Sequence, residues 1–430
     1  MITQFKHILP GLLCIFILVA CGGQPAAEQP AVTDEDTTAE EAPAPEEDTT
    51  TEEEPATEGD TAAEEEADTD TTAEESEAPD AASGDDLDAL IAAATEEGEV
   101  TVYSFTSRIA RVEEAFEAQY PDIDLVGLDI SSTEQIARIQ AEQEAGVAEA
   151  DVAYISDAPV VYGELVQEGI LEAYVPPEFT DRIPAEYQEP LVANRISTKV
   201  LMYNEEAYPD GSPVTNLWEL TQPEWTGKVV MVDPLVRGDY LDLMTEVVLQ
   251  SDAMAAAYEE LFGAPIELGS DATTAGEQWI VDLFANDLIL VDSTDSVNAA
   301  VGAIGQEDPP VGFTSYSDRR DNEDEGWALQ VANEVAPSPG IAFPALLGIV
   351  RDAPNPSAAQ LFIHFMMGDD SPTGGPGYEP FYVPGDYATR TDIEPHPDAI
   401  PLDEFRAWQI DTVATLEIRQ DVSDLILILQ

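Results

Sequence analysis

Alternating helix-like and strand-like patterns constrain the fold of this chain more than any other feature of its sequence. Apolar residues recur at helical spacing or in short strand-like runs, in the order helix 86–95, strand 99–105, helix 108–119, strand 122–130, helix 131–145 and strand 151–155. Units of strand, helix and strand at this spacing give parallel strands that are joined by helical crossovers. The sequence therefore predicts an α/β fold in which helices flank parallel-rich sheets.

The same alternation restarts in the second half of the chain. The sequence predicts strands at 200–203, 228–232, 288–291, 311–313 and 342–350, with helices at 240–250 and 356–367. Two α/β units in one chain leave a crevice between them, which is a usual place for a ligand. We therefore expect two lobes, and residues 86–430 are long enough to give each lobe its own core.

The amino-terminal residues resemble a bacterial lipoprotein signal. A weakly basic start precedes the apolar run 8–19, whose length fits a signal-peptide core of roughly 7–15 residues and is too short to span a bilayer. Small residues then lead into Cys21, so we expect a signal peptide at 1–20 and a lipid anchor on Cys21. An ordinary cleaved leader is the alternative. Because Cys14 leaves with the leader, the exported body has no cysteine pair to oxidise.

The composition of the next segment predicts an acidic tether at 21–85. The whole chain is also strongly acidic. From residue 22 onward the segment consists mostly of Ala, Thr, Glu, Asp and Pro, without Lys, Arg or aromatic residues, so it lacks the apolar surface that would offset ordering entropy. The full chain has 15 Lys and Arg against 89 Asp and Glu, a net charge of −74. Nucleic acids and anionic lipids need basic surfaces, so this charge argues against both as partners.

Several short motifs carry a resemblance to a known family, and their order covers nearly all of the body. The motifs are 100–107, 120–124, 151–157, 201–204, 218–220, 225–228, 231–234, 339–340, 353–356, 362–367 and 387–390. Together they resemble the extracellular solute-binding proteins of ABC importers, in the type-2 periplasmic-binding fold group that includes the ferric-ion binders.

The resemblance implies a domain organisation and a transport function. The first part of lobe 1 is expected at 86–197, lobe 2 at 198–338, and the return strand with the second part of lobe 1 at 339–430. A hinge would let the lobes close over a small solute, either a ferric ion or a small anion. The expected protein is a monomeric receptor, lipid-anchored outside the cell, that delivers this solute to a membrane permease driven by a separate ATPase.

The resemblance also implies where ligand contacts lie, on turns after strands and at helix amino termini, where free N–H groups favour an anion. The predicted ligand-binding residues are Ser104, Thr106, Ser107, Arg108, Ser131, Ser132, Thr133, Asp157, Arg237, Gly238, Asp239, Tyr240, Ser315 and Tyr316. Arg108 is the foremost candidate, because a guanidinium fork matches carboxylate or phosphate oxygens. Helix capping is the alternative role of the hydroxyls at 131–133.

Tyr240 and Tyr316 are the candidate metal ligands, since phenolate oxygens bind ferric ions. The ferric binders of this family typically use an adjacent pair of tyrosines, and this chain has no such pair. Tyr103 and Asp157 are the other candidates for an iron site. Iron therefore stays open as the solute beside an organic or phosphorylated anion, and the sequence implies no other cofactor.

The sequence favours a binding protein over an enzyme. His364 and His396 are the only histidines of the body, and neither lies in a catalytic motif; His364 fits a helix of the lobe core. Nucleophile elbows, zinc-binding histidine pairs and phosphate-binding lysine loops are all missing from the sequence. A carboxylate-dependent hydrolase stays open as the alternative, because the chain has so many Asp and Glu residues. The acidic run 321–326 lacks the twelfth-position Glu of a calcium loop, where Ala332 stands.

Overall fold

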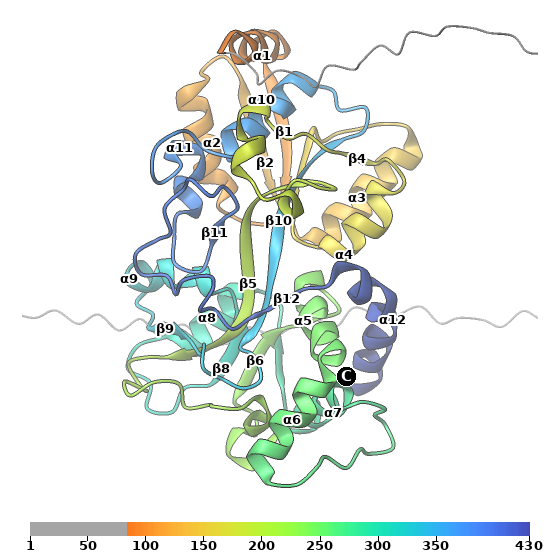
Figure 1. The fold of residues 1–430 in the computed structure, drawn as a ribbon, viewed down its shortest axis with the longest axis vertical. Coiled ribbons are helices and arrows are strands. Elements are labelled where there is room, and N and C mark those ends of the chain that lie inside the picture. Colours follow the sequence, from red (N-terminus) through yellow and green to blue (C-terminus); the bar gives the residue numbers. More distant parts are fainter. Residues whose placement is uncertain (1–83) are drawn as a thin grey trace, which may run out of the picture. The chain divides into compact units, whose positions relative to one another are not determined.

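The computed structural model describes residues 84–430 (Figure 1). The predicted signal peptide, Cys21 and nearly all of the predicted tether lie outside the described residues. Within 84–430, every helix is either too short or too polar to cross a membrane.

The first α/β unit follows the predicted alternation closely. Strand β1 pairs in parallel with β2, where Glu99 lies opposite Asp124, and with β3, where Val102 lies opposite Val152. The predicted parallel strands are therefore confirmed. The elements of this part are α1 (Gly84–Glu97), β1 (Glu99–Ser104), α2 (Ile109–Gln119), β2 (Asp124–Asp129), α3 (Ser132–Ala145), β3 (Val152–Ile155), α4 (Ala158–Val160), a π-helical turn (Val161–Val166) and β4 (Leu171–Glu172).

Two long antiparallel strands connect the two ends of the sheet, β5 (Val192–Asn204) and β10 (Gly340–Val350) (Figure 1). The strand order is β2-β1-β3-β10-β5-β8-β6-β7. Every residue of β5 is buried. Gly340 of β10 has a φ of 150°, and a Cβ atom there would overlap the carbonyl oxygen of Lys199 in β5. Glycine is required at that position.

The second α/β unit is built on β6, which pairs in parallel with β7 and β8. Two antiparallel partners of β5, namely β8 and β9, attach this unit to the central strands. Its elements are β6 (Val229–Val232), α5 (Gly238–Leu249), α6 (Ser251–Phe262), α7 (Ala275–Ala285), β7 (Ile289–Val291), α8 (Thr294–Gly302), β8 (Val311–Thr314), α9 (Asn322–Glu325) and β9 (Leu329–Val331).

Separate hydrophobic clusters lie toward the two ends of the central strands. Phe116 and Phe362 belong to a cluster of the first unit, whereas Trp218, Trp279 and Phe313 belong to a cluster of the second. Each unit therefore buries enough apolar surface to form a core of its own. The predicted α/β class, with a large sheet flanked by helices, is confirmed.

After β10 the chain adds a helix to the first α/β unit, and its last helix then contacts both units. Helix α10 (Pro356–Met366) packs on α1, and it contains His364 as predicted. The last helix, α12 (Thr412–Leu429), instead packs against α5, α7 and α4 (Figure 1). Val422 and Ile426 join the core of the second unit, whereas Leu416 packs on a core cluster of the first, so α12 contacts both units. The remaining elements are α11 (Gly375–Tyr378), β11 (Tyr387–Ala388) and β12 (Trp408–Gln409).

Candidate functional site

A polar cavity of about 230 Å³ lies among residues of both α/β units. Its lining consists of Phe105, Thr106, Ser107, Arg108, Asp129, Arg195, Ser197, Lys199, Arg237, Ser293, Thr294, Asp295, Ser315, Ser317, Asp318 and Arg320. A larger cavity of about 670 Å³ lies between α1, α10 and the segment 177–182, but its lining is mainly apolar and includes no predicted ligand residue. The polar cavity is therefore the candidate ligand site.

The amino termini of three α-helices meet at this cavity. Arg108 directly precedes α2, Arg237 directly precedes α5, and Ser293 caps α8 by accepting a hydrogen bond from the backbone N–H of Ser296. All three residues line the cavity. Free N–H groups and the positive ends of the helix dipoles favour a negatively charged ligand at such a place.

Strand β5 is a buried core strand, but three polar residues on one of its faces line the cavity. Successive side chains of a strand alternate between faces, so Arg195, Ser197 and Lys199 share one face, and all three line the cavity. Five basic residues line the cavity in total, in a chain with only 15. This concentration of a scarce residue type indicates a binding role.

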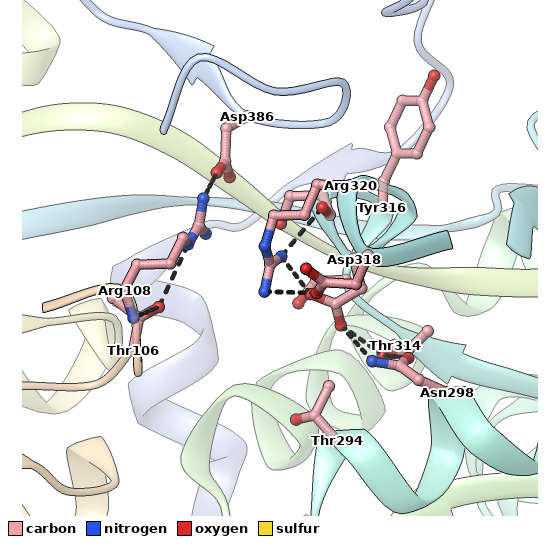
Figure 2. A network of polar contacts seen from close by, with 12 residues as sticks. Thr106, Arg108, Thr294, Asn298, Thr314, Tyr316, Asp318, Arg320 and Asp386 are labelled. Carbon is pink, nitrogen blue, oxygen red and sulfur yellow. Dashed lines mark hydrogen bonds and ion pairs between the residues drawn. The ribbon is translucent and has the colours of Figure 1, made fainter. Parts of the chain in front are cut away.

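Arg108 and Arg195 share the carboxylate of Asp386 at one end of the cavity. The Arg108 Nη1 to Asp386 Oδ2 distance is 2.5 Å, and the Arg195 Nη1 to Asp386 Oδ1 distance is 2.6 Å. Burial lowers the pKa of Arg108 to about 10, so its guanidinium stays charged at neutral pH. Figure 2 shows Arg108 extending from the loop of Thr106 toward Asp386. The Nη2 atom of Arg195 is buried without a hydrogen-bond partner in the described structure.

Two further carboxylates hold the other basic residues of the cavity. Asp239 Oδ2 lies 3.0 Å from Lys199 Nζ and 3.4 Å from Arg237 Nη2. Burial alone would raise the pKa of Asp239, but Lys199 and Arg237 lower it below the usual value. Asp318 pairs with Arg320 at 2.8 Å and accepts a hydrogen bond from Asn298, as Figure 2 shows. These contacts fix the basic side chains before any ligand arrives.

The structure brings part of the predicted ligand set to the cavity, namely Thr106, Ser107, Arg108, Arg237 and Ser315. Their role in binding stays a prediction. Ser104, Gly238 and Asp239 lie next to the cavity without lining it: Ser104 donates to the carbonyl of Thr106, and Gly238 begins α5.

The predicted residues at 131–133 and Asp157 have structural partners instead. Ser131 caps α3 by accepting from the N–H of Glu134, which is the alternative role that the sequence left open. The hydroxyls of Ser132 and Ser156 lie 2.9 Å apart. Thr133 accepts a hydrogen bond from the N–H of Gly238, and Asp157 pairs with Arg419 at 2.9 Å. None of these four side chains lines the cavity.

The two candidate metal ligands lie in different surroundings. Tyr240 is fully buried, and this burial raises the pKa of its phenol and disfavours the phenolate that iron needs. Tyr316 stacks on Phe405 and contacts the backbone of Asp398 through its hydroxyl, with its ring directed away from the polar network (Figure 2). Among residues 84–430, no group of three or more His, Cys, Asp or Glu side chains is placed to hold a metal ion. The role of Tyr240 and Tyr316 as metal ligands therefore stays a prediction.

Sequence analysis missed several cavity residues, above all Arg195, Lys199 and Arg320. The sequence did contain a signal for Arg195 and Lys199, because two basic residues on one face are unusual in a buried strand. Arg320 belongs to the only pair of adjacent basic residues in the chain. The other missed residues are Asp129, Ser197, Ser293, Thr294, Asp295 and Asp318.

Comparisons with known proteins agree with this architecture. The family model described as bacterial extracellular solute-binding protein matches residues 98–371. Iron-bound HitA from Pseudomonas aeruginosa superposes with a TM-score of 0.59 at 17% identity, covering 77% of this chain and 99% of HitA. AfuA from Actinobacillus pleuropneumoniae, with fructose-6-phosphate bound, gives 0.57 at 20% identity, covering 77% and 97%. Apo ferric ion-binding protein A from Pasteurella haemolytica gives 0.57 at 16%, covering 77% and 98%. At these identities the structural likeness establishes the fold alone, and no curated protein matches the sequence.

Proposed function

Because this chain belongs to the bacterial extracellular solute-binding proteins, we propose that it captures a small solute that carries an anionic group and several hydroxyl groups. Proteins of this family work outside the cytoplasm and deliver their ligand to an ABC permease; the family is a solute-binding component of transport and not an enzyme family. The permease and the ATPase of this importer would be separate chains.

The observation that carries this proposal is the cavity lined by five basic side chains and three helix amino termini. Guanidinium groups pair with carboxylate or phosphate oxygens in a two-pronged geometry. The hydroxyls of Thr106, Ser107, Ser197, Ser293, Thr294, Ser315 and Ser317 line the same cavity and suit a polyhydroxylated ligand. The volume of about 230 Å³ is below the roughly 300–1,000 Å³ of drug-sized pockets, which favours a small solute.

An anion is favoured over a ferric ion. Ferric ions need several hard oxygen ligands, whereas burial raises the pKa of the Tyr240 phenol and Tyr316 stacks on Phe405. The similar AfuA structure contains fructose-6-phosphate, whereas HitA contains iron, so the fold accommodates either kind of ligand. The side chains of this cavity match the first kind.

The test is binding of glucose 6-phosphate, inorganic phosphate, citrate and ferric ion to residues 84–430, measured by thermal unfolding and calorimetry. A bound anion stabilises the protein by about 2.7 kcal/mol when its concentration is 100 times Kd. We expect Arg108→Met to weaken anion binding by about 2–5 kcal/mol, because it removes a guanidinium group, only 7% exposed, that would pair with the anion.

The matched control is Arg406→Met, which removes an arginine that is 41% exposed and outside the cavity lining. Unchanged anion affinity in Arg108→Met, or tight binding of ferric ion alone, would overturn the proposal. Turnover of a bound ester or glycoside would instead favour the hydrolase alternative.

We also propose that Cys21 carries a lipid that anchors the protein outside the cell, with the acidic residues 22–83 as a spacer. More than one acyl chain is needed for stable anchoring. Replacing Cys21 by alanine in the full chain should therefore release the protein from the membrane fraction into the soluble extracytoplasmic fraction. Retention of Cys21→Ala in washed membranes would contradict the anchor and leave the ligand proposal intact.

A further inference from the structure

Helix α12 contacts both α/β units, and it lies beside α5 and α4 (Figure 1). Val422 and Ile426 of this helix are buried in the hydrophobic core of the second unit. Leu416, nearer the start of the helix, packs instead on a core cluster of the first unit that includes Val161 and Leu165. One helix therefore has apolar contacts with both units.

Gly163, in the π-helical turn of the first unit, is a place where α12 comes very close to that unit. A Cβ atom at position 163 would overlap the Cδ2 atom of Leu416. The φ angle of Gly163 is not positive, so its backbone conformation does not itself require glycine. The missing side chain therefore leaves room for Leu416 of α12.

Polar contacts also cross between the two units. Arg419 on α12 donates to Asp157 Oδ2 of the first unit at 2.9 Å and to Asp242 Oδ1 of the second at 2.8 Å. The backbone N–H of Gly238, which begins α5, donates to Thr133 Oγ1 of α3 at 3.2 Å. A Cβ atom at Gly238 would overlap Asp157 Oδ2, so these two polar contacts are adjacent. Separating the two units would break both of them.

We infer that three contacts form a clasp that holds the two α/β units together before a solute binds, namely Leu416 with Gly163, Arg419 with Asp157, and Gly238 with Thr133. None of these six residues lines the polar cavity, so the clasp acts on the arrangement of the two units and not on the solute. When the binding-competent arrangement is only partly populated, the apparent affinity falls by that fraction. The clasp favours the closed arrangement, in which α12 contacts both units, and therefore strengthens binding of whichever solute the cavity takes.

The experiment measures the separation of the two units by single-molecule fluorescence energy transfer, without added solute. Residues 84–430 contain no cysteine, so dyes can be attached at Glu144→Cys in α3 and Glu260→Cys in α6, which are both exposed. We expect molecules without a further substitution to be mainly closed. Gly163→Ala should raise the ratio of open to closed molecules at least about 5-fold, because the added methyl group pushes Leu416 away. That ratio corresponds to about 1 kcal/mol, the lower end of the cost of overpacking a contact.

Asp157→Asn is the second variant, because it removes the charge of one partner, keeps the size of the side chain and should shift the ratio in the same direction. The matched controls are Gly269→Ala, in the exposed loop between α6 and α7, and Asp421→Asn, an exposed carboxylate of α12. Both controls should leave the ratio unchanged, and circular dichroism shows whether each variant is folded.

An unchanged ratio in both Gly163→Ala and Asp157→Asn would overturn the clasp. Molecules that are mainly open without any substitution in the clasp, or an equal shift in the two controls, would overturn it too. Because no solute is added, none of these results depends on the proposed ligand. A failure of the anions to bind would overturn the proposed function and leave the clasp standing.

Discussion

Replacing Asp386 by alanine is expected to lower the free energy of unfolding by about 3–5 kcal/mol, the usual cost of removing one partner from a buried ion pair. Asp386 and Arg195 are fully buried and Arg108 is 7% exposed, so both guanidinium groups would remain away from water without a counter-charge. Urea unfolding of residues 84–430 measures the loss. Because a bound anion would supply the missing charge, we also expect the variant to gain more stability from saturating phosphate than the native protein does.

Two further variants make this result interpretable. Asp386→Asn keeps an acceptor oxygen for one arginine and should lose less stability than Asp386→Ala. Asp370→Ala removes an 82% exposed carboxylate that pairs with Arg182, and its effect should stay within about 1 kcal/mol. A loss of the same small size in Asp386→Ala would mean that Asp386 does not hold the two arginines in place.

Replacing Arg419 by leucine is expected to lower the free energy of unfolding by about 3–5 kcal/mol near neutral pH, because two buried carboxylates would lose their counter-charge. The guanidinium of Arg419 on α12 lies 2.9 Å from Asp157 and 2.8 Å from Asp242, and each of these carboxylates is 2% exposed. Asp157 precedes α4 in the first unit, whereas Asp242 lies in α5 of the second. Arg419 therefore joins the two units at the edge of the cavity.

The stability lost in Arg419→Leu should depend on pH, because Asp157 and Asp242 titrate. Burial raises the pKa of Asp157 and of Asp242, and Arg419 opposes that rise. A carboxyl group with a raised pKa in the folded state favours folding below its unfolded pKa, and this contribution is lost as the pH rises through the folded pKa. Without Arg419 both pKa values rise further, so Arg419→Leu should lose less stability at about pH 5 than at about pH 8.

Urea unfolding at both pH values measures this difference, with Arg406→Leu as the control. Arg406 is 41% exposed and pairs with Glu334, which is 85% exposed, so its loss should be small and nearly independent of pH. An equal loss in Arg419→Leu at both pH values would indicate that Asp157 and Asp242 do not titrate in this range.

The alternation of strands and helices was predictable because it depends on local periodicity. Strand β1 begins at Glu99 and α3 ends at Ala145, as the pattern of apolar residues predicts. The place of α12 was not predictable from its own pattern. An amphipathic helix shows that it must bury one face, but the partner of that face is decided by the rest of the chain.

Arg108 was predictable as a cavity residue, because it combines a scarce residue type with a position between a strand and a helix. Asp386 was not, since it lies 278 positions away from Arg108 in the chain and belongs to a loop without a motif. Tyr316 was expected to contact the ligand, and in the structure its ring stacks on Phe405; the sequence of a short turn does not fix the direction of each side chain.

The sequence by itself determined the α/β class, the acidic character, the scarcity of basic residues and the family, because periodicity, composition and motif order are properties of the chain alone. Only the tertiary structure decided which charges meet. The pairs of Asp386 with Arg108 and Arg195, of Asp239 with Lys199, and of Arg419 with Asp157 and Asp242 all join distant segments. Coulomb interactions and desolvation depend on distance and burial in space, and neither can be read from separation along the chain.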